Sequence, residues 1–403
     1  MCFVDKGRYK TLCFFILDYY LCHFKTAPMI YFHIPFCKQA CHYCDFHFST
    51  SMQYKAELLD RMEVEVKLRA DYLEDKSVES IYFGGGTPSL LSGEEINRLI
   101  DTVSRYFEIS SNAEITLEAN PDDLDANKVA ALRDTPINRF SIGIQSFYEE
   151  DLRWMNRAHN AAEAESAVKR VQDAGFELLT CDLIYGFPLL TDEKWASNMQ
   201  KLIDWQVPHI SSYAMSVENK TALNHLVKSG KTPPMNEEQA AAQMLMMIDT
   251  LTRSGYEHYE ISNFAKNKQY AKHNTNYWRG KHYLGIGPSA HSFNGTSRSW
   301  NIANNQKYIA ALHSGEGFQE TEVLSAQDRI NEYIMTALRT MWGIDLAYVQ
   351  QSFGSDTTQE IMRQAETFIA TKHLELRDGN LVLTSNGKVL ADHIMSDLFF
   401  VTD

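Results

Sequence analysis

Three cysteines lie within eight residues of one another in the run HIPFCKQACHYCDFHF: Cys37, Cys41 and Cys44. Their spacing is C-x3-C-x2-C, so one short loop can bring three thiolates together. A cubane iron–sulfur cluster normally takes four cysteine thiolates. Three local cysteines would therefore leave one iron free for a small-molecule ligand. Such an open position is typical of an enzyme or a cofactor-handling protein rather than a plain binding module.

Two other chemistries fit the same residues. A C-x2-C pair is half of many zinc sites, and His33, His42 or His47 is near enough in sequence to supply a fourth ligand. A redox disulfide is the other option, although Cys41 and Cys44 do not follow a thioredoxin-like pattern. The spacing favours an iron–sulfur site and leaves the zinc site and the disulfide open.

The composition is that of a globular chain from a reducing compartment. The 403 residues are enough for two or three domains, and 44% hydrophobic residues is an ordinary share. The net charge of −14, from 38 basic and 52 acidic residues, argues against a broad nucleic-acid surface. Seven cysteines is an odd number, and three of them cluster, so this is not a secreted disulfide framework. We expect a cytoplasmic protein, because cluster ligands must remain thiolates.

The N-terminal residues differ from the rest of the chain. Their apolar run, from Leu12 to Phe24, covers about 13 residues and is interrupted by Asp18, whereas a membrane span needs roughly 20. The basic residues before this run resemble a signal peptide only weakly. We therefore expect a protein that is not integral to the membrane. We interpret residues 1–28 as an added or mis-assigned leader, with Met29 at the start of the folded chain.

From Met29 onward, short apolar runs alternate with helical patterns. The expected strands cover residues 30–33, 80–83, 114–119, 139–144, 178–184 and 209–214. The expected helices cover residues 54–73, 94–107, 126–133, 162–174 and 193–205. Ser92 and Glu95 form a capping-box pattern before the second helix. Six strand–helix units predict an α/β fold with a parallel sheet, in the form of an open, partial TIM-like barrel.

Polar residues and glycines follow these expected strands. The first strand leads to Cys37 and the second to the run GGGTP, while the others end near Glu118, Gln145, Asp182 and Tyr213. In barrels of parallel strands, the chemistry lies at the carboxyl ends of the strands. The triple glycine lacks the Gly-Lys-Ser/Thr of a P-loop and the pattern of a dinucleotide turn. It is either a tight turn or a place where backbone approaches a ligand closely.

The chain changes character after residue 263. A long helix from about residue 236 to 254 and a possible strand at 256–262 precede a segment, 264–281, with five basic residues, no acidic residue and the run HNTNYW. Residues 326–403 are expected to form helix, helix, hairpin and helix, with Asp378-Gly379 as the hairpin turn. This order resembles a winged helix. Its six basic and eleven acidic residues argue against nucleic-acid binding and favour a lid or a partner surface.

The motifs together resemble a known family. The runs CKQACHYC, YFGGGTP, ITLEANPDDL, FSIGIQSF, CDLIYGFP and YLGIGPSAHSF are similar to those of the radical S-adenosylmethionine (SAM) superfamily. Within it, they resemble the group that contains oxygen-independent coproporphyrinogen III oxidases and related haem chaperones. The resemblance covers residues 29–400 and implies a radical SAM barrel at 29–263, a connecting segment at 264–325 and a winged-helix-like α+β domain at 326–403.

The resemblance also implies cofactors and their residues. It implies a 4Fe–4S cluster on Cys37, Cys41 and Cys44, with SAM chelating the open iron. The residues that match the SAM site of the family are Tyr31, Tyr43, Gly85, Gly86, Thr87, Glu118, Gln145, Arg157, Asp182, Ala214 and His291. Each of these is also explicable as an ordinary strand-end polar residue or turn residue. Cys181, within an expected strand, is interpreted as a buried small hydrophobic residue.

One departure separates the two branches of this group. The oxidases resemble this chain but carry a further cysteine two places after the third ligand, where this chain has Phe46. The run HNTNYW resembles the H-N-x-x-Y-W pattern of the haem chaperones. The basic segment suits haem propionates, Tyr277 and Trp278 suit the haem face, and His273 is a candidate axial ligand. An ordinary structural histidine in a solvated basic loop is the alternative.

Three functions follow from these features. The preferred one is a haem chaperone, with haem and acceptor haemoproteins, including membrane-associated respiratory ones, as its partners. The second is a radical SAM oxidoreductase that decarboxylates or otherwise modifies a tetrapyrrole. The third, from a different class, is a zinc-stabilised winged-helix regulator, which the acidic C-terminal region disfavours.

Overall fold

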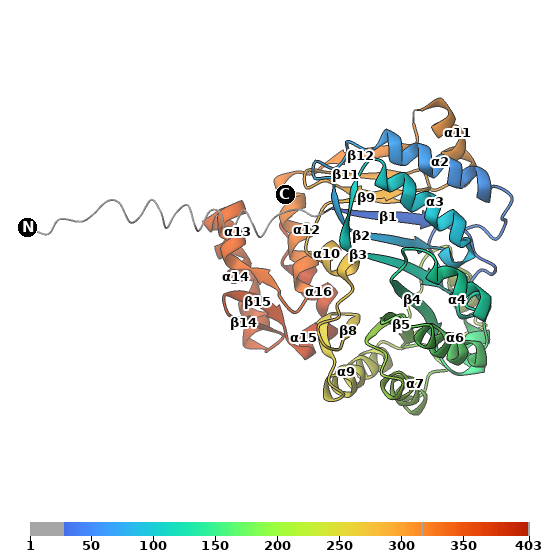
Figure 1. The fold of residues 1–403 in the computed structure, drawn as a ribbon. Helices are drawn as coiled ribbons and strands as arrows, with labels where there is room; N and C mark the ends of the chain where they lie inside the picture. Colours follow the sequence, from blue (N-terminus) through green and yellow to red (C-terminus); the bar gives the residue numbers. More distant parts are fainter. Residues whose placement is uncertain (1–27, 316, 402–403) are drawn as a thin grey trace, which may run out of the picture.

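A computed structural model of the chain describes residues 28–315 and 317–401 (Figure 1). The expected leader, apart from Pro28, lies outside the described residues. The described chain forms a large curved sheet lined by helices on its outer side, followed by a smaller C-terminal unit with a sheet of its own. Two hydrophobic cores correspond to these two parts. No helix of the described chain combines the length and apolar character needed to cross a membrane.

Six consecutive parallel strands form the centre of the large sheet, and all six were expected from the sequence. They are β1 (Met29–Ile34), β2 (Ser77–Gly85), β3 (Glu108–Ala119), β4 (Arg139–Gln145), β5 (Leu178–Tyr185) and β6 (His209–Ala214), adjacent in this order. The helices between them are α2 (Lys55–Leu68), α3 (Gly93–Ser104), α4 (Ala126–Arg133), α5 (Glu149–Trp154), α6 (Ala161–Asp173) and α7 (Asp192–Asp204). Single turns of 3-10 helix, Pro88–Leu90 and Pro121–Asp123, follow β2 and β3. The predicted capping box of Ser92 and Glu95 is confirmed at the start of α3.

The two faces of the parallel strands differ in chemistry, because side chains alternate along a strand. Ile30 and Phe32 of β1, like Ile81 and Phe83 of β2, are fully buried in the main hydrophobic core. The opposite face carries polar side chains at the paired positions, beginning with Tyr31 beside Tyr82. A strand buried on both faces would be apolar on both. The inner face of the curved sheet is therefore polar, in contrast to its apolar outer face.

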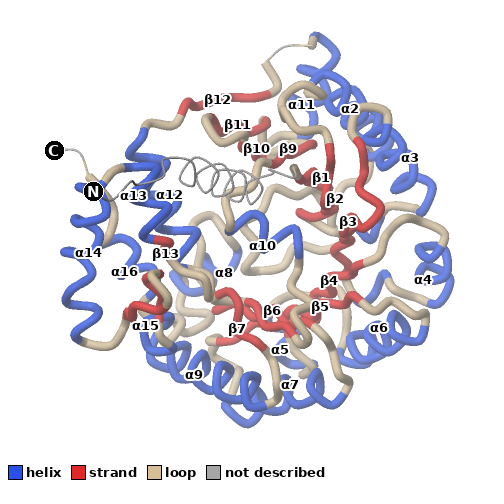
Figure 2. The backbone as a smooth tube through the Cα atoms, turned by 60° about the vertical axis from the view of Figure 1, so that its left-hand side comes forward, coloured by secondary structure: helices blue, strands red, loops and turns tan. Residues whose placement is uncertain are grey.

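Shorter strands extend the sheet on both sides. β9 (Tyr283–Ile286) pairs in parallel with β1, and β10 (His291–Phe293), β11 (Ser297–Asn301) and β12 (Gln319–Val323) continue antiparallel. On the other side, β8 (Asn263–Ala265) pairs with β6 and with β7 (Glu257–Glu260). The possible strand expected at 256–262 is confirmed in its central part as β7, but it ends at Glu260, where the chain turns back into β8. Because β12 and β7 end the sheet and do not pair with each other, the barrel is open, as predicted (Figure 2).

Helices α8 (Ala222–Lys228), α9 (Glu237–Arg253) and α11 (Asn305–Ser314) complete the main part. The basic segment holds a further short helix, α10 (Lys272–Trp278), rather than being a loop throughout. The Glu114 carboxylate accepts the backbone N–H groups of Lys272 and His273, each at 3.0 Å. A carboxylate at this end satisfies unpaired N–H groups and interacts favourably with the helix dipole. Glu114 is 158 residues from Lys272, so local sequence does not reveal this cap.

The C-terminal unit is winged-helix-like, although its element order differs from the expectation. Three helices rather than two precede the hairpin, and two short ones follow it. The elements are α12 (Ala326–Leu338), β13 (Ile344–Asp345), α13 (Leu346–Phe353), α14 (Ser355–Ala370), β14 (Leu374–Arg377), β15 (Asn380–Leu383), α15 (Ser385–Val389) and α16 (Ala391–Asp397). Asp378 and Gly379 form the predicted turn, both with positive φ, as a tight hairpin requires. The unit contacts the sheet through Arg339, which pairs with the buried Glu260 at 2.8 Å.

Candidate functional site

The cysteine loop follows β1 and is fixed on both sides by backbone contacts. Cys37 N–H donates to the carbonyl of Ser49 at 3.0 Å, which closes the loop on itself. On the other side, His42 N–H donates to the carbonyl of Met155 at 3.0 Å, and Asn156 Nδ2 donates to the carbonyl of Ala40 at 2.7 Å. The loop is therefore held against the segment that follows α5, and its three free cysteines are half-buried.

The three cysteine thiols do not converge as a single-ion site would require. Among the described residues, no group of three or more His, Cys, Asp or Glu side chains could hold a metal ion. A cubane is wider than an ion, because each cysteine binds a different iron. Burial raises the pKa of Cys37, and it raises the pKa of Cys44 to about 12. Burial therefore favours the protonated thiols, and a bound cationic centre would favour the thiolates.

The histidines near the loop are engaged elsewhere, which removes support from the zinc alternative. His33 Nε2 bonds the carbonyl of His47 at 2.9 Å, and His42 Nδ1 bonds the carbonyl of Trp154 at 2.8 Å. His47 Nε2 bonds Asn305 Oδ1 at 2.7 Å. Among the described residues, these rings do not join the cysteines in a group arranged to hold a zinc ion.

Arg157 connects the cysteine loop to the strand ends. Its Nη1 donates to Cys41 Sγ at 3.4 Å and to Tyr43 Oη at 3.3 Å. Its Nη2 donates to Asn120 Oδ1 at 2.7 Å and to the carbonyl of Gly143 at 2.9 Å. The buried Nε has no partner among the described residues. The guanidinium thus offers positive charge beside a cysteine sulfur and keeps one donor for a ligand.

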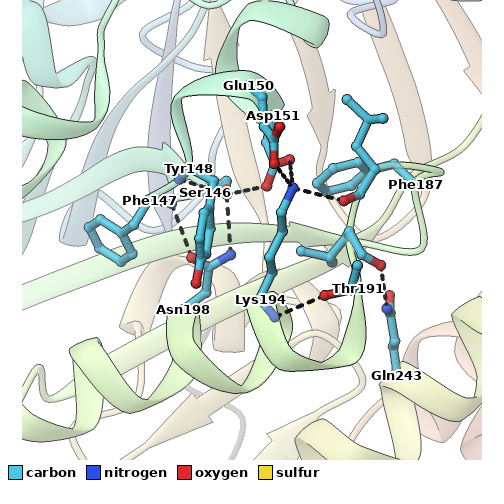
Figure 3. Close-up of polar contacts among 12 residues, drawn as sticks. Ser146, Phe147, Tyr148, Glu150, Asp151, Phe187, Thr191, Lys194, Asn198 and Gln243 are labelled. Atoms are coloured by element: carbon cyan, nitrogen blue, oxygen red, sulfur yellow. Dashed lines mark hydrogen bonds and ion pairs between the residues drawn. The ribbon is translucent and has the colours of Figure 1, made fainter.

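A buried polar network holds the segment that carries Arg157 (Figure 3). Ser146, after β4, donates to Asp151 Oδ2 at 2.7 Å, and Lys194 of α7 pairs with Asp151 Oδ1 at 3.0 Å. Asn198 Nδ2 donates to Ser146 Oγ at 3.2 Å, which ties the same turn to α7. The network fixes the start of α5, and α5 leads directly to the contacts with the cysteine loop.

Asp151→Ala is expected to destabilise the protein by about 2 kcal/mol, because it leaves the buried Ser146 hydroxyl without its acceptor and removes one of the two carboxylates that pair with Lys194. The matched control is Arg153→Ala on the same helix, which removes an exposed pair with Glu149. That pair should contribute no more than about 0.5 kcal/mol. Denaturant unfolding of both variants measures the difference. Equal losses in the two variants would contradict the role of the buried network.

The glycine run lies directly against the residues that precede the cysteines. Gly86 N–H donates to the carbonyl of Ile34 at 2.9 Å, and Thr87 N–H donates to the carbonyl of Phe36 at 2.7 Å. A Cβ on Gly86 would stand 2.6 Å from the Phe36 carbonyl oxygen. Gly85 has a φ of +107°, and a Cβ there would stand 2.7 Å from the His33 ring. Glycine is required at both positions, so the run is more than an ordinary turn.

Two carboxylates line the inner face beyond the glycines. Glu118 accepts Tyr82 Oη at 2.7 Å and the N–H of Gly85 at 3.1 Å, and burial raises its pKa to about 7. Asp182 accepts Ser141 Oγ at 3.1 Å, and burial raises its pKa to about 6. Acidic side chains whose pKa lies near neutral pH can bind a cationic group, and their protonation then changes with that binding.

The raised pKa of Glu118 predicts a pH-dependent stability difference. Folded Glu118 keeps a proton that the unfolded chain releases between pH 4.5 and about 7, so its contribution to the free energy of unfolding decreases as the pH rises through this window. Glu118→Gln cannot titrate. The unfolding free energy of the wild type minus that of the variant should therefore fall across the window, as measured by denaturant titration at each pH. A constant difference would contradict the raised pKa.

The other expected SAM residues surround this region. Tyr31 Oη bonds His33 Nδ1 at 3.2 Å. Gln145 ends β4 with a φ of 64°, a left-handed conformation that is uncommon outside glycine. Ala214 ends β6. Burial is the main cause that lowers the pKa of His33, and the nearby His47 and His291 side chains lower it further. The structure thus brings the strand-end residues, the glycines and the cysteine loop to one end of the barrel.

The three candidate haem residues share α10 but have different surroundings. His273 is 7% exposed, bonds Ser80 Oγ at 2.9 Å and packs on the Tyr82 ring inside the sheet. Burial lowers its pKa to about 3, so the imidazole is neutral. Tyr277 is 38% exposed, whereas Trp278 lies under the guanidinium of Arg339 at 4.6 Å.

Several residues of the site were missed from the sequence. The main ones are Tyr82, Glu114, Asn120, Ser141 and Asn156. Alternation along β2 and β4 could have identified Tyr82 and Ser141, because both stand on the polar face. Nothing local marks Asn156, which contacts the cysteine loop across more than a hundred residues.

Comparison with known proteins identifies the family. The model of the radical SAM superfamily matches residues 31–202, and that of the HemN C-terminal domain matches residues 324–390. The chain is 30% identical over 367 residues to the haem chaperone HemW of Bacillus subtilis, covering 90% of this chain and 97% of the relative. It is 32% identical over 386 residues to HemW of Mycobacterium tuberculosis, covering 92% and 96%. The chain belongs to the HemW family of the radical SAM superfamily.

A solved structure shows that the HemW family shares its fold with a tetrapyrrole enzyme. The coproporphyrinogen III oxidase HemN of Escherichia coli superposes with a TM-score of 0.80 at 23% identity, over 93% of this chain and 90% of the oxidase. This likeness confirms the α/β radical SAM fold with an additional C-terminal domain. Membership of the superfamily implies a 4Fe–4S cluster and SAM.

Proposed function

We propose that the chain binds haem and transfers it to acceptor haemoproteins, in the cytoplasm. The observation that carries this proposal is the similarity, over nearly the whole chain, to proteins named haem chaperones. In this proposal the chain has a barrel at 29–263, a connecting segment at 264–325 and a C-terminal domain at 326–403. The family assignment leaves no support for the zinc-stabilised regulator.

We assign the cluster to Cys37, Cys41 and Cys44. Arg157 would stabilise the thiolate of Cys41, as its 3.4 Å contact suggests. When bound, the cluster and SAM together supply one-electron chemistry, while the protein supplies placement and exclusion of water. Two observations support this assignment. The cysteine loop is held in place by its contacts, and the neighbouring glycines have no room for a Cβ.

We assign SAM to the strand ends. The carboxylate of Glu118 suits the methionyl ammonium, and the backbone at Gly85, Gly86 and Thr87 would lie along the same end of the ligand. The polar side chains Asp182 and Gln145 and the free Nε of Arg157 suit ribose and other polar groups. Tyr31, Tyr43, Ala214 and His291 would line the remaining walls.

We assign haem to the basic segment that includes α10. Lysine and arginine side chains suit propionates, and Tyr277 offers an exposed aromatic face. Ser80 engages Nδ1 of His273, so Nε2 is the ring nitrogen that would bind iron. His273→Ala should therefore change the haem spectrum if this histidine is the ligand. An unchanged affinity and spectrum would remove it from the proposal.

A radical SAM oxidoreductase acting on a tetrapyrrole is the second candidate, and the shared fold with HemN favours it. Phe46, 65% exposed where the oxidases have a further cysteine, argues against it. The deciding experiment reconstitutes the protein anaerobically and measures haem binding and coproporphyrinogen turnover side by side. We expect stoichiometric haem binding without turnover. Efficient formation of protoporphyrinogen would overturn the chaperone proposal.

A further inference from the structure

Strand β12 is an open edge of the large sheet. It pairs with β11 on one side, and no described strand pairs with it on the other (Figure 2). All five of its residues, Gln319–Val323, are exposed, and Val323 is 80% exposed. An uncovered edge presents unpaired N–H and C=O groups that can add a further strand.

The register of β12 against β11 determines which backbone groups of β12 point away from the sheet. Ile302 N–H donates to the carbonyl of Phe318, and Leu324 N–H donates to the carbonyl of Thr296. In an antiparallel pair, residues that bond the neighbour alternate with residues that do not. The even-numbered residues of β12 therefore face β11, while Gln319, Thr321 and Val323 direct their N–H and C=O groups away from the sheet.

The side chains alternate as well, and this fixes the chemistry of a partner. Glu322 lines a groove of about 230 Å³ together with Leu324, Asp328, Asn331, Glu332, Met335 and Phe399. By alternation, Glu320 points to the same face as Glu322. The opposite face of the strand carries Gln319, Thr321 and Val323. An added strand would meet acidic side chains on one face and uncharged, partly apolar ones on the other.

A second copy of the chain does not suit this edge. Antiparallel pairing of β12 with itself about Thr321 would place Glu320 opposite Glu322 on both sides of the centre. Like charges directly opposite each other destabilise a strand pair. The occupant must instead bring positive charge to the groove face.

We infer that β12 binds an extended segment of a partner protein in which basic residues alternate with β-branched apolar ones. The partner segment adds a thirteenth strand to the sheet. Its basic side chains lie over Glu320, Glu322 and the groove, and its apolar side chains lie beside Val323. This surface does not depend on the cluster, SAM or haem, so the inference stands or falls apart from the proposed function.

The test uses a labelled peptide of about nine residues with alternating lysine and valine, long enough to overlap a short strand at both ends. Fluorescence anisotropy measures its binding to the full chain. Thr321→Pro removes one outward N–H and leaves the bonds to β11 intact, because proline is tolerated at strand edges. Thr321→Val is the matched control, since it keeps the N–H.

We expect saturable binding to the wild type and to Thr321→Val. Binding to Thr321→Pro should be at least about fivefold weaker, as loss of an inter-strand hydrogen bond predicts. The double variant Glu320→Lys/Glu322→Lys, whose backbone is unchanged, should lose the lysine peptide and bind a glutamate–valine peptide instead. This exchange decides the question if Thr321→Pro fails to fold. Unchanged binding by the variants, or no saturable binding to the wild type, would overturn the inference.

Discussion

Cys41→Ser is expected to lose nearly all of its iron and its visible absorption after anaerobic reconstitution. A cluster that has three protein ligands cannot spare one, and serine oxygen is a poor substitute for thiolate sulfur. Cys41 is also the cysteine that Arg157 contacts at 3.4 Å, so its replacement removes the sulfur beside the guanidinium. Iron and sulfide content per chain measures the effect.

The matched control is Cys181→Ser. Cys181 is fully buried in β5, as expected from the sequence, and belongs to the hydrophobic core rather than to the loop. Its replacement should leave the iron content unchanged, although a buried hydroxyl lowers stability somewhat. Full iron content in Cys41→Ser would show that the cluster is held elsewhere.

Gly85→Ala is expected to weaken SAM binding at least about tenfold, equivalent to about 1.4 kcal/mol. Three effects combine in this variant. Alanine is strained at a φ of +107°, and its Cβ would stand 2.7 Å from the His33 ring. The displaced N–H would also lose its bond to Glu118, which orients that carboxylate. Equilibrium dialysis with labelled SAM measures the affinity.

Gly175→Ala is the control for a strained alanine outside the candidate SAM site. Gly175 has a similar φ of +80°, but nothing lies within 4 Å of the position of its Cβ. The control therefore carries the backbone strain without the crowding, and its SAM affinity should equal that of the wild type. If Gly85→Ala bound SAM within about twofold of this control, a difference below about 0.4 kcal/mol, the glycine run would not belong to the SAM site.

The sequence predicts best where each residue's role is local. The six central strands follow from their buried apolar runs, and the start of α3 follows from the pairing of Ser92 with Glu95 three residues away. The cysteine loop was identified because its three ligands are neighbours in sequence. These features need no knowledge of distant parts of the chain.

Features that depend on distant contacts were not predicted. Strands β8 to β12 have three to five residues each, too few to show a pattern, and they form because an existing sheet edge offers them partners. Helix α10 depends on Glu114, and the cysteine loop depends on Asn156. Both partners are more than a hundred residues from the groups they bond. The burial of His273 likewise follows from the sheet around it rather than from its own sequence.

The most direct test of the proposed function is transfer of haem. The reconstituted protein is loaded with one equivalent of haem and mixed with the apo form of a b-type respiratory cytochrome, and the acceptor's spectrum is followed. In the presence of a haem scavenger, the account predicts that the loaded protein delivers haem to the acceptor faster than free haem binds the acceptor. Cys41→Ser, which keeps the basic segment, should transfer haem poorly. Haem that stays bound, or that reaches the acceptor only through solution, would contradict the account.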